Sequence, residues 1–119
     1  MPLIEVRADL EKNRLYMRLV GLPSHARARE LKHRLTVELA KLKPGFTLLN
    51  DSRGLLLEPG TIQPLVYDIM KTIAAAKPAK VARVVSEKPG VELDKLSKLA
   101  GYIAGVFDSI EKAEEYLDE

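Results

Sequence analysis

The chain has 119 residues, enough for one domain with a hydrophobic core. Hydrophobic residues make up 46% of it and the formal net charge is only +2, the balance of an ordinary globular protein. The absence of cysteine excludes disulfide bonds, thiolate metal ligands and a cysteine nucleophile. No apolar run approaches the ~20 residues of a membrane-spanning helix, and the start does not resemble a secretion signal, so we expect a cytoplasmic protein.

Charge is distributed unevenly along the chain. Residues 1–45 contain ten Lys and Arg against five Asp and Glu, whereas residues 91–119 contain three against eight. Two solvated faces of one domain would account for this difference. The alternative is that the opposite charges steer a partner or a second copy of the chain, which would give a homodimer.

Two strands are predicted near the start, at residues 3–8 and 14–20. In the second, apolar and polar side chains alternate, which is typical of a half-buried strand. The short polar link between them ends in Asn13, a residue type that tolerates a left-handed turn. The two segments therefore predict a β-hairpin.

A helix is predicted after Ser24, which is a favourable N-cap. Its apolar residues follow a spacing of three and four, so that one face is buried; they are Ala28, Leu31, Leu35, Leu39 and Leu42. Pro44 and Gly45 end this helix.

The middle of the chain predicts a buried strand at residues 46–49, closed by a polar turn at residues 50–54. A loop at residues 53–60 follows, and its three leucines, at 55–57, are unusually apolar. The next helix starts near Ile62 and carries an apolar stripe to Ala76, with a proline in its first turn.

The last third predicts a β-branched strand at residues 81–85 and a helix at residues 92–102. A minimal strand at residues 106–107 comes next. Residues 108–111 resemble a capping box that opens a terminal helix.

The expected fold is therefore α/β. A hairpin followed by alternating helices and strands predicts one domain, residues 1–119, with a mixed, mostly parallel sheet and about four α-helices packed on it as a sandwich. In such sheets, ligands and partners dock where the parallel strands end, which points to the polar residues after the third strand.

This order of elements resembles the STAS fold, and more closely the SpoIIAA-like group of small bacterial proteins related to anti-sigma-factor antagonists. The resemblance is carried by residues 46–55, 80–86 and 106–117 and covers nearly the whole chain. It implies a non-enzymatic, regulatory protein-interaction module whose partner is a kinase-type or anti-sigma-type regulator. In that group a serine at the start of the helix after the third strand is phosphorylated. Thr61 falls on this position, and Asp51 falls on the acid that closes the strand.

Four residues form the candidate partner, ligand or phosphorylation site: Asp51, Ser52, Arg53 and Thr61. A helix start favours anions, so phosphate on Thr61 would bring roughly two negative charges to this surface. The plainer role of Thr61 is an N-cap. Ser52 is expected to form the turn rather than to react, and Arg53 either binds an anion or is a solvated turn residue.

The sequence offers little support for metal binding, catalysis, nucleic-acid binding or membrane binding. His25 and His33 are eight residues apart on one helix and off its apolar stripe, so we expect both to be exposed and neither to hold a metal. No phosphate-binding loop or catalytic set is present, so we expect no enzyme and no cofactor. The basic residues on the first helix have no aromatic residues between them, which argues against nucleic-acid binding. The apolar stripe of the same helix is needed for the core, which argues against membrane binding. A small apolar or anionic ligand under the leucine-rich loop is the alternative function.

Overall fold

The computed structural model of the chain describes residues 3–21, 24–56, 63–86 and 91–119. Within these ranges it contains five strands and four helices. The strands are β1 (Leu3–Asp9), β2 (Arg14–Gly21), β3 (Thr47–Leu55), β4 (Lys80–Val84) and β5 (Ala104–Phe107). The helices are α1 (His25–Leu39), α2 (Gln63–Ala75), α3 (Val91–Ala100) and α4 (Ile110–Asp118). None of the described helices is both long enough and apolar enough to cross a bilayer.

The strands form one sheet in the order β1-β2-β3-β4-β5. The first pair is antiparallel, with Leu3 opposite Val20 and Asp9 opposite Arg14, and the other three pairs are parallel. At the turn of the hairpin, Asn13 has the left-handed φ of 51° that the sequence predicts. Its side chain also exchanges two hydrogen bonds with the backbone of Lys43 beyond α1, so the hairpin turn is fixed to the following connection.

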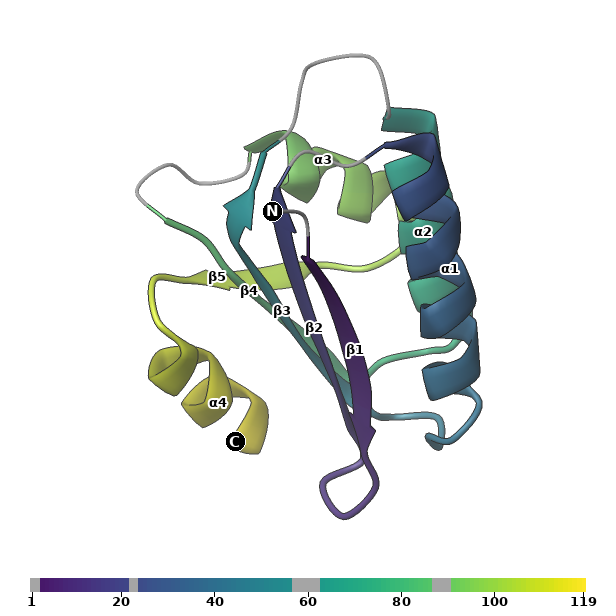
Figure 1. The fold of residues 1–119 in the computed structure, drawn as a ribbon. Helices are drawn as coiled ribbons and strands as arrows, with labels where there is room; N and C mark the ends of the chain where they lie inside the picture. Colours follow the sequence, from purple (N-terminus) through teal and green to yellow (C-terminus); the bar gives the residue numbers. More distant parts are fainter. Residues whose placement is uncertain (1–2, 22–23, 57–62, 87–90) are drawn as a thin grey trace.

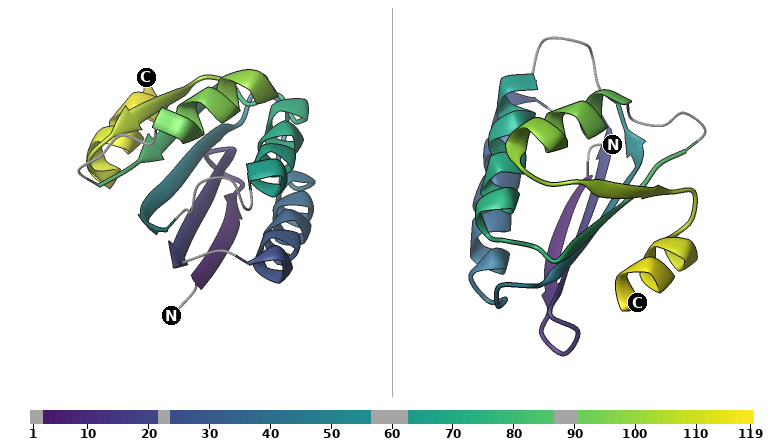
Figure 2. Two further views of the ribbon diagram at one scale, coloured as in Figure 1. Left: turned by 90° about the horizontal axis from the view of Figure 1, so that it is seen from above. Right: turned by 180° about the vertical axis from the view of Figure 1, so that it is seen from behind.

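The helices lie on both faces of this sheet (Figure 1). Each of the three connections between parallel strands passes through one helix. Such connections are right-handed, and the strand order always advances in one direction across the sheet. For this reason α1, α2 and α3 lie on the same face of the sheet. Helix α4 packs on the opposite face, against β3, β4 and β5 (Figure 2). The radius of gyration is 13.0 Å, close to the roughly 13.5 Å expected for a compact domain of this length.

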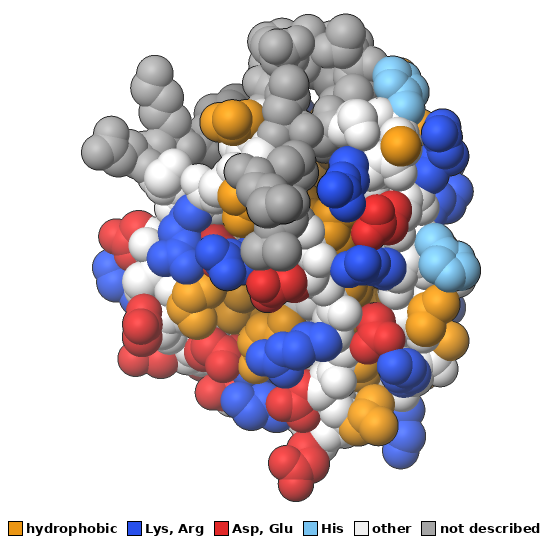
Figure 3. Space-filling model, in the orientation of Figure 1, with side chains coloured by type: hydrophobic (Ala, Val, Ile, Leu, Met, Phe, Trp, Pro, Cys, Tyr) orange, Lys and Arg blue, Asp and Glu red, His pale blue; other side chains and the backbone are white. Residues whose placement is uncertain are grey.

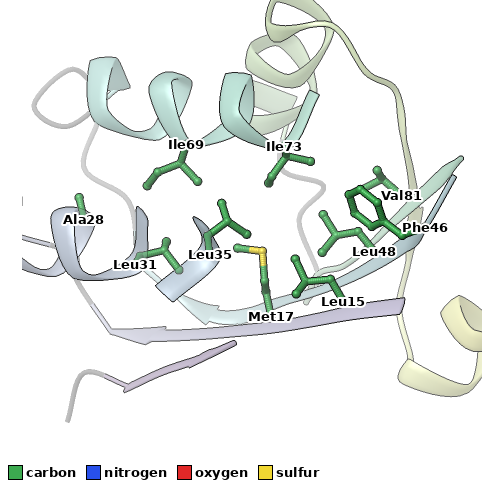
Figure 4. Packing of buried hydrophobic residues seen from close by; sticks show 10 residues of the cluster. All are labelled: Leu15, Met17, Ala28, Leu31, Leu35, Phe46, Leu48, Ile69, Ile73 and Val81. Carbon is green, nitrogen blue, oxygen red and sulfur yellow. The ribbon is translucent and has the colours of Figure 1, made fainter. Parts of the chain in front are cut away.

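Two hydrophobic clusters hold these layers together. The larger one fills the space between the sheet and the first two helices (Figure 4), where Leu35 of α1 and Ile73 of α2 meet Met17 and Leu48 of the sheet. The smaller one lies under α4 and includes Leu117. Fully burying a side chain of this kind stabilises the fold by about 1.5–3 kcal/mol, so the alternation along β2 and the stripe of α1 dictate which faces pack.

Several boundaries confirm the sequence-based predictions and three correct them. Ser24 caps α1, as predicted, by accepting a hydrogen bond from the N–H of Arg27. The cap of α4 is Ser109, one residue after the first position of the predicted capping box, and it accepts from the N–H of Lys112. Helix α1 ends at Leu39, one turn before the predicted stop, because residues beyond it close in turns. Strand β5 begins at Ala104 rather than at residue 106. Its first residues belong to the strand because they pair with β4, and an apolar pattern of only two residues does not reveal this pairing.

Candidate functional site

The polar residues after the predicted third strand lie inside the strand. The sequence predicts a turn at residues 50–54, but β3 continues to Leu55, so that prediction is wrong. Strand β2 extends alongside this segment, and Gly54 and Leu55 pair with Val20 and Gly21. Pairing with a distant strand therefore overrides the local preference of Asn, Asp and Ser for a turn.

The pairing contains one irregularity, and it explains the position of Arg53. Between the pairs Arg18–Asp51 and Val20–Gly54, β3 has two residues opposite a single residue of β2, which is a β-bulge. The backbone N–H of Arg53 donates to Oδ1 of Asp51 at 3.2 Å. Asp51 thus makes the local backbone bond expected of an Asp in a turn, but it does so within a bulged strand.

The same carboxylate holds the Arg53 side chain. Nε and Nη2 of Arg53 donate to the two oxygens of Asp51 at 2.9 and 2.8 Å, and Nε of Arg18 lies 3.9 Å from Oδ2. The Asp51 side chain is only 9% exposed, whereas those of Arg53 and Arg18 are 46% and 53% exposed. The hydrogen bonds from Arg53 lower the pKa of Asp51, and they outweigh burial, which raises it. A partner approaching this face would therefore meet the positioned guanidinium group of Arg53 above a buried anion, and beside it Arg18, which also lies 3.8 Å from Glu5.

The other candidate residues have different environments. Ser52 is buried, and its hydroxyl oxygen finds no hydrogen-bond partner within the described part of the chain. Leu56, the residue after β3, is 62% exposed, and Leu55 is half-buried. Thr61 and Leu57 lie outside the described residues. The structure thus brings Asp51 and Arg53 together, and the grouping of either with Thr61 stays a prediction.

A second polar group lies on the opposite face of the sheet, and the sequence analysis missed it. Arg83 is paired with Asn50 in the parallel register, and Asn50 is paired with Met17 of the larger core cluster, so all three face α1, α2 and α3. Arg83 is 1% exposed, and its Nη1 donates to Oδ1 of Asp94 in α3 at 2.6 Å. A single charged residue inside a β-branched strand is the signal that could have identified it, because such a charge must find a partner.

The histidines and the remaining hollow offer no comparable chemistry. His25 and His33 are both exposed, as predicted, and histidine side chains lie on the surface over α1 in Figure 3. No group of three potential metal-ligating side chains occurs within residues 3–21, 24–56, 63–86 and 91–119. A groove of about 460 Å³ between α1 and α2 is open to solvent, and an ion pair between Lys32 and Asp68 spans it.

Comparison with known proteins supports the fold. No family model matches the sequence, and no curated protein matches it. The structure is similar to the crystal structure of an uncharacterised protein of the DUF3478 family from Shewanella loihica PV-4, described as having a SpoIIAA-like fold. The two share a TM-score of 0.70 over 98% of this chain and 93% of the other, with 17% sequence identity. The chain therefore has a SpoIIAA-like fold, as its element order predicts.

Proposed function

We propose that this domain is a non-enzymatic, regulatory protein-interaction module and that its partner docks on the exposed end of β3. The observation that carries the proposal is the exposed guanidinium group of Arg53, which two hydrogen bonds fix to the buried carboxylate of Asp51, with the exposed Arg18 of the neighbouring strand 3.9 Å from the same carboxylate. Arginine is enriched among the residues that dominate binding energy at protein interfaces. Because Arg53 is already positioned, little of its side-chain entropy is lost on binding.

Leu56 extends this surface beyond the two arginines. A leucine that is 62% exposed beside positioned charges provides apolar area that a partner could bury. An acidic partner would complement the guanidinium groups, and the resemblance to anti-sigma-factor antagonists favours a kinase-type or anti-sigma-type regulator. On the face shown in Figure 3, basic and acidic side chains are mixed and form no broad field of one sign. That face therefore offers no continuous basic surface for an extended polyanion.

A photo-crosslinking amino acid at Leu56 tests this proposal in cells of the source organism. We expect a covalent adduct of defined mass that disappears when Arg53→Glu is added. Two matched controls lie on α1, in the opposite layer: the crosslinker at Val37, an apolar residue that is 45% exposed, and the charge reversal Arg29→Glu at another exposed arginine. Equal adducts at Leu56 and Val37, or an adduct indifferent to Arg53→Glu, would show that this surface is not the docking site.

Binding of a small ligand is the alternative function, and a different observation favours it. It was expected under the leucines at 55–57, but Leu56 is largely exposed and Leu57 lies outside the described residues. The buried polar groups on the opposite face of the sheet provide better support, because two of them, on Asn50 and Arg83, lack partners among the described residues.

A further inference from the structure

The domain contains two almost fully buried arginines whose hydrogen bonding differs sharply. The side chain of Arg14 in β2 is 4% exposed, and that of Arg83 in β4 is 1% exposed. Arg14 uses all three of its nitrogens: Nε donates to Thr47 at 2.8 Å, and Nη1 and Nη2 donate to Glu114 and Asp118 at 2.7 Å each. Every nitrogen of this guanidinium is thus bonded within the protein, and the group fixes α4 to the sheet.

Arg83 is engaged less completely, by Asp94 of α3 and by the nearby hydroxyl of Tyr102. Its Nη1 donates to Asp94, and its Nε–H is buried without a described partner. An unsatisfied buried donor costs about 1–3 kcal/mol, and more when the group is charged, so proteins rarely leave one without a partner. The edge formed by Nε and Nη2 is the side of the fork that pairs with two oxygens of one oxyanion.

The surroundings of this edge are polar. Burial raises the pKa of Tyr102 to about 12, and both the charge of Arg83 and a hydrogen bond with it oppose this rise, so the Tyr102 hydroxyl lies beside the guanidinium. Oδ1 of Asn50, the residue paired with Arg83 in the sheet, is a buried acceptor with no described partner. The cluster lies close to the surface, since the side chain of Asp94, which bonds Arg83, is 31% exposed.

We propose that this edge of Arg83, through its buried Nε–H, binds the carboxylate of a small molecule that also carries a hydroxyl or amine, which donates to Oδ1 of Asn50. The nearby Asp94 already balances the charge of Arg83, so a monoanion is favoured over a dianionic phosphate. This site lies on the face opposite Arg18, Asp51 and Arg53, so it goes beyond the proposed docking function and does not depend on it.

Nuclear magnetic resonance of arginine Nε–H groups tests the site directly, with Arg14, whose Nε–H donates to Thr47, as an internal control. The probes are glycolate, which has a carboxylate and a hydroxyl; acetate, which has only the carboxylate; and inorganic phosphate. We expect glycolate to shift the Arg83 Nε–H signal saturably, with acetate and phosphate binding more weakly and the Arg14 signal unmoved. The Arg83 signal is assigned by its loss in Arg83→Lys.

Two variants make the test specific. Arg83→Lys keeps the charge but removes the Nε–H, and should weaken glycolate binding, followed through backbone amide shifts in place of the lost signal, by about tenfold or more. If this core variant does not fold, Asn50→Ala replaces it and should abolish the preference for glycolate over acetate. An Arg83 signal that none of the three probes moves would show that the edge is filled by the chain or by a buried water, which overturns the inference. A stronger response to phosphate, or equal shifts at Arg14 and Arg83, would overturn it as well.

Discussion

Replacing Arg53 with alanine tests whether Asp51 is held by this arginine. The change removes two charge-assisted hydrogen bonds, at 2.9 and 2.8 Å, from a carboxylate that is 9% exposed. The backbone N–H of residue 53 and the more distant Arg18 remain as partners, and the shortened side chain admits water. We therefore expect the free energy of unfolding at pH 7 to fall by about 1–2 kcal/mol, less than for a fully orphaned buried charge.

The pH dependence of this loss identifies its electrostatic origin. Arg53 lowers the pKa of Asp51 below its ordinary value of 3.8, so the folded protein gains stability above that value and loses it as pH falls through the lower, folded pKa. In Arg53→Ala the chief cause of the lowering is gone, and burial, which raises the pKa, remains. The difference between the two proteins should therefore be fully present above about pH 5 and shrink towards pH 3.

Urea denaturation followed by circular dichroism at pH 7, 5 and 3 measures both effects. Arg29→Ala on α1 serves as the control, because Arg29 is exposed and should change stability by less than about 0.5 kcal/mol. A loss in Arg53→Ala that is the same at pH 3 and pH 7 would refute the electrostatic explanation. No loss at pH 7 would refute the contact itself.

Two further substitutions probe how α4 is attached to the sheet. Arg14→Met should lower the free energy of unfolding by about 2–4 kcal/mol in urea denaturation, since Glu114 and Asp118 lose their buried partner but can still be hydrated; a loss below about 1 kcal/mol would contradict this role. Ser109→Ala should cost about 1 kcal/mol in thermal denaturation, because the N–H of Lys112 loses its cap, and an unchanged midpoint would show that the cap contributes nothing.

Local patterns predicted most of the elements because their causes are local. The alternation along β2, the stripe of α1 and the Ser24 cap each depend on residues a few positions apart, and all appear in the structure. The clearest error was at residues 50–54, where the local turn preference was strong. Pairing with β2 and β4 and a bulge keep this segment in β3, and none of these is visible in the segment itself.

The candidate site was predicted only in part for the same reason. The sequence singled out Asp51 and Arg53 as polar residues near a strand end, and the structure joins them. It did not identify Arg18, which reaches this site from β2, or Arg83, whose partner Asp94 is eleven positions away in α3. The packing of separate elements creates these contacts, so composition and periodicity do not report them.

Native mass spectrometry of the protein isolated gently from its own host tests the proposed docking function most directly, with wild type, Arg53→Glu and Arg29→Glu compared side by side. The proposal predicts a complex with a second protein for wild type and Arg29→Glu, and its loss for Arg53→Glu. A complex that survives in all three would contradict docking at the end of β3. A bare chain in all three would contradict the interaction module itself.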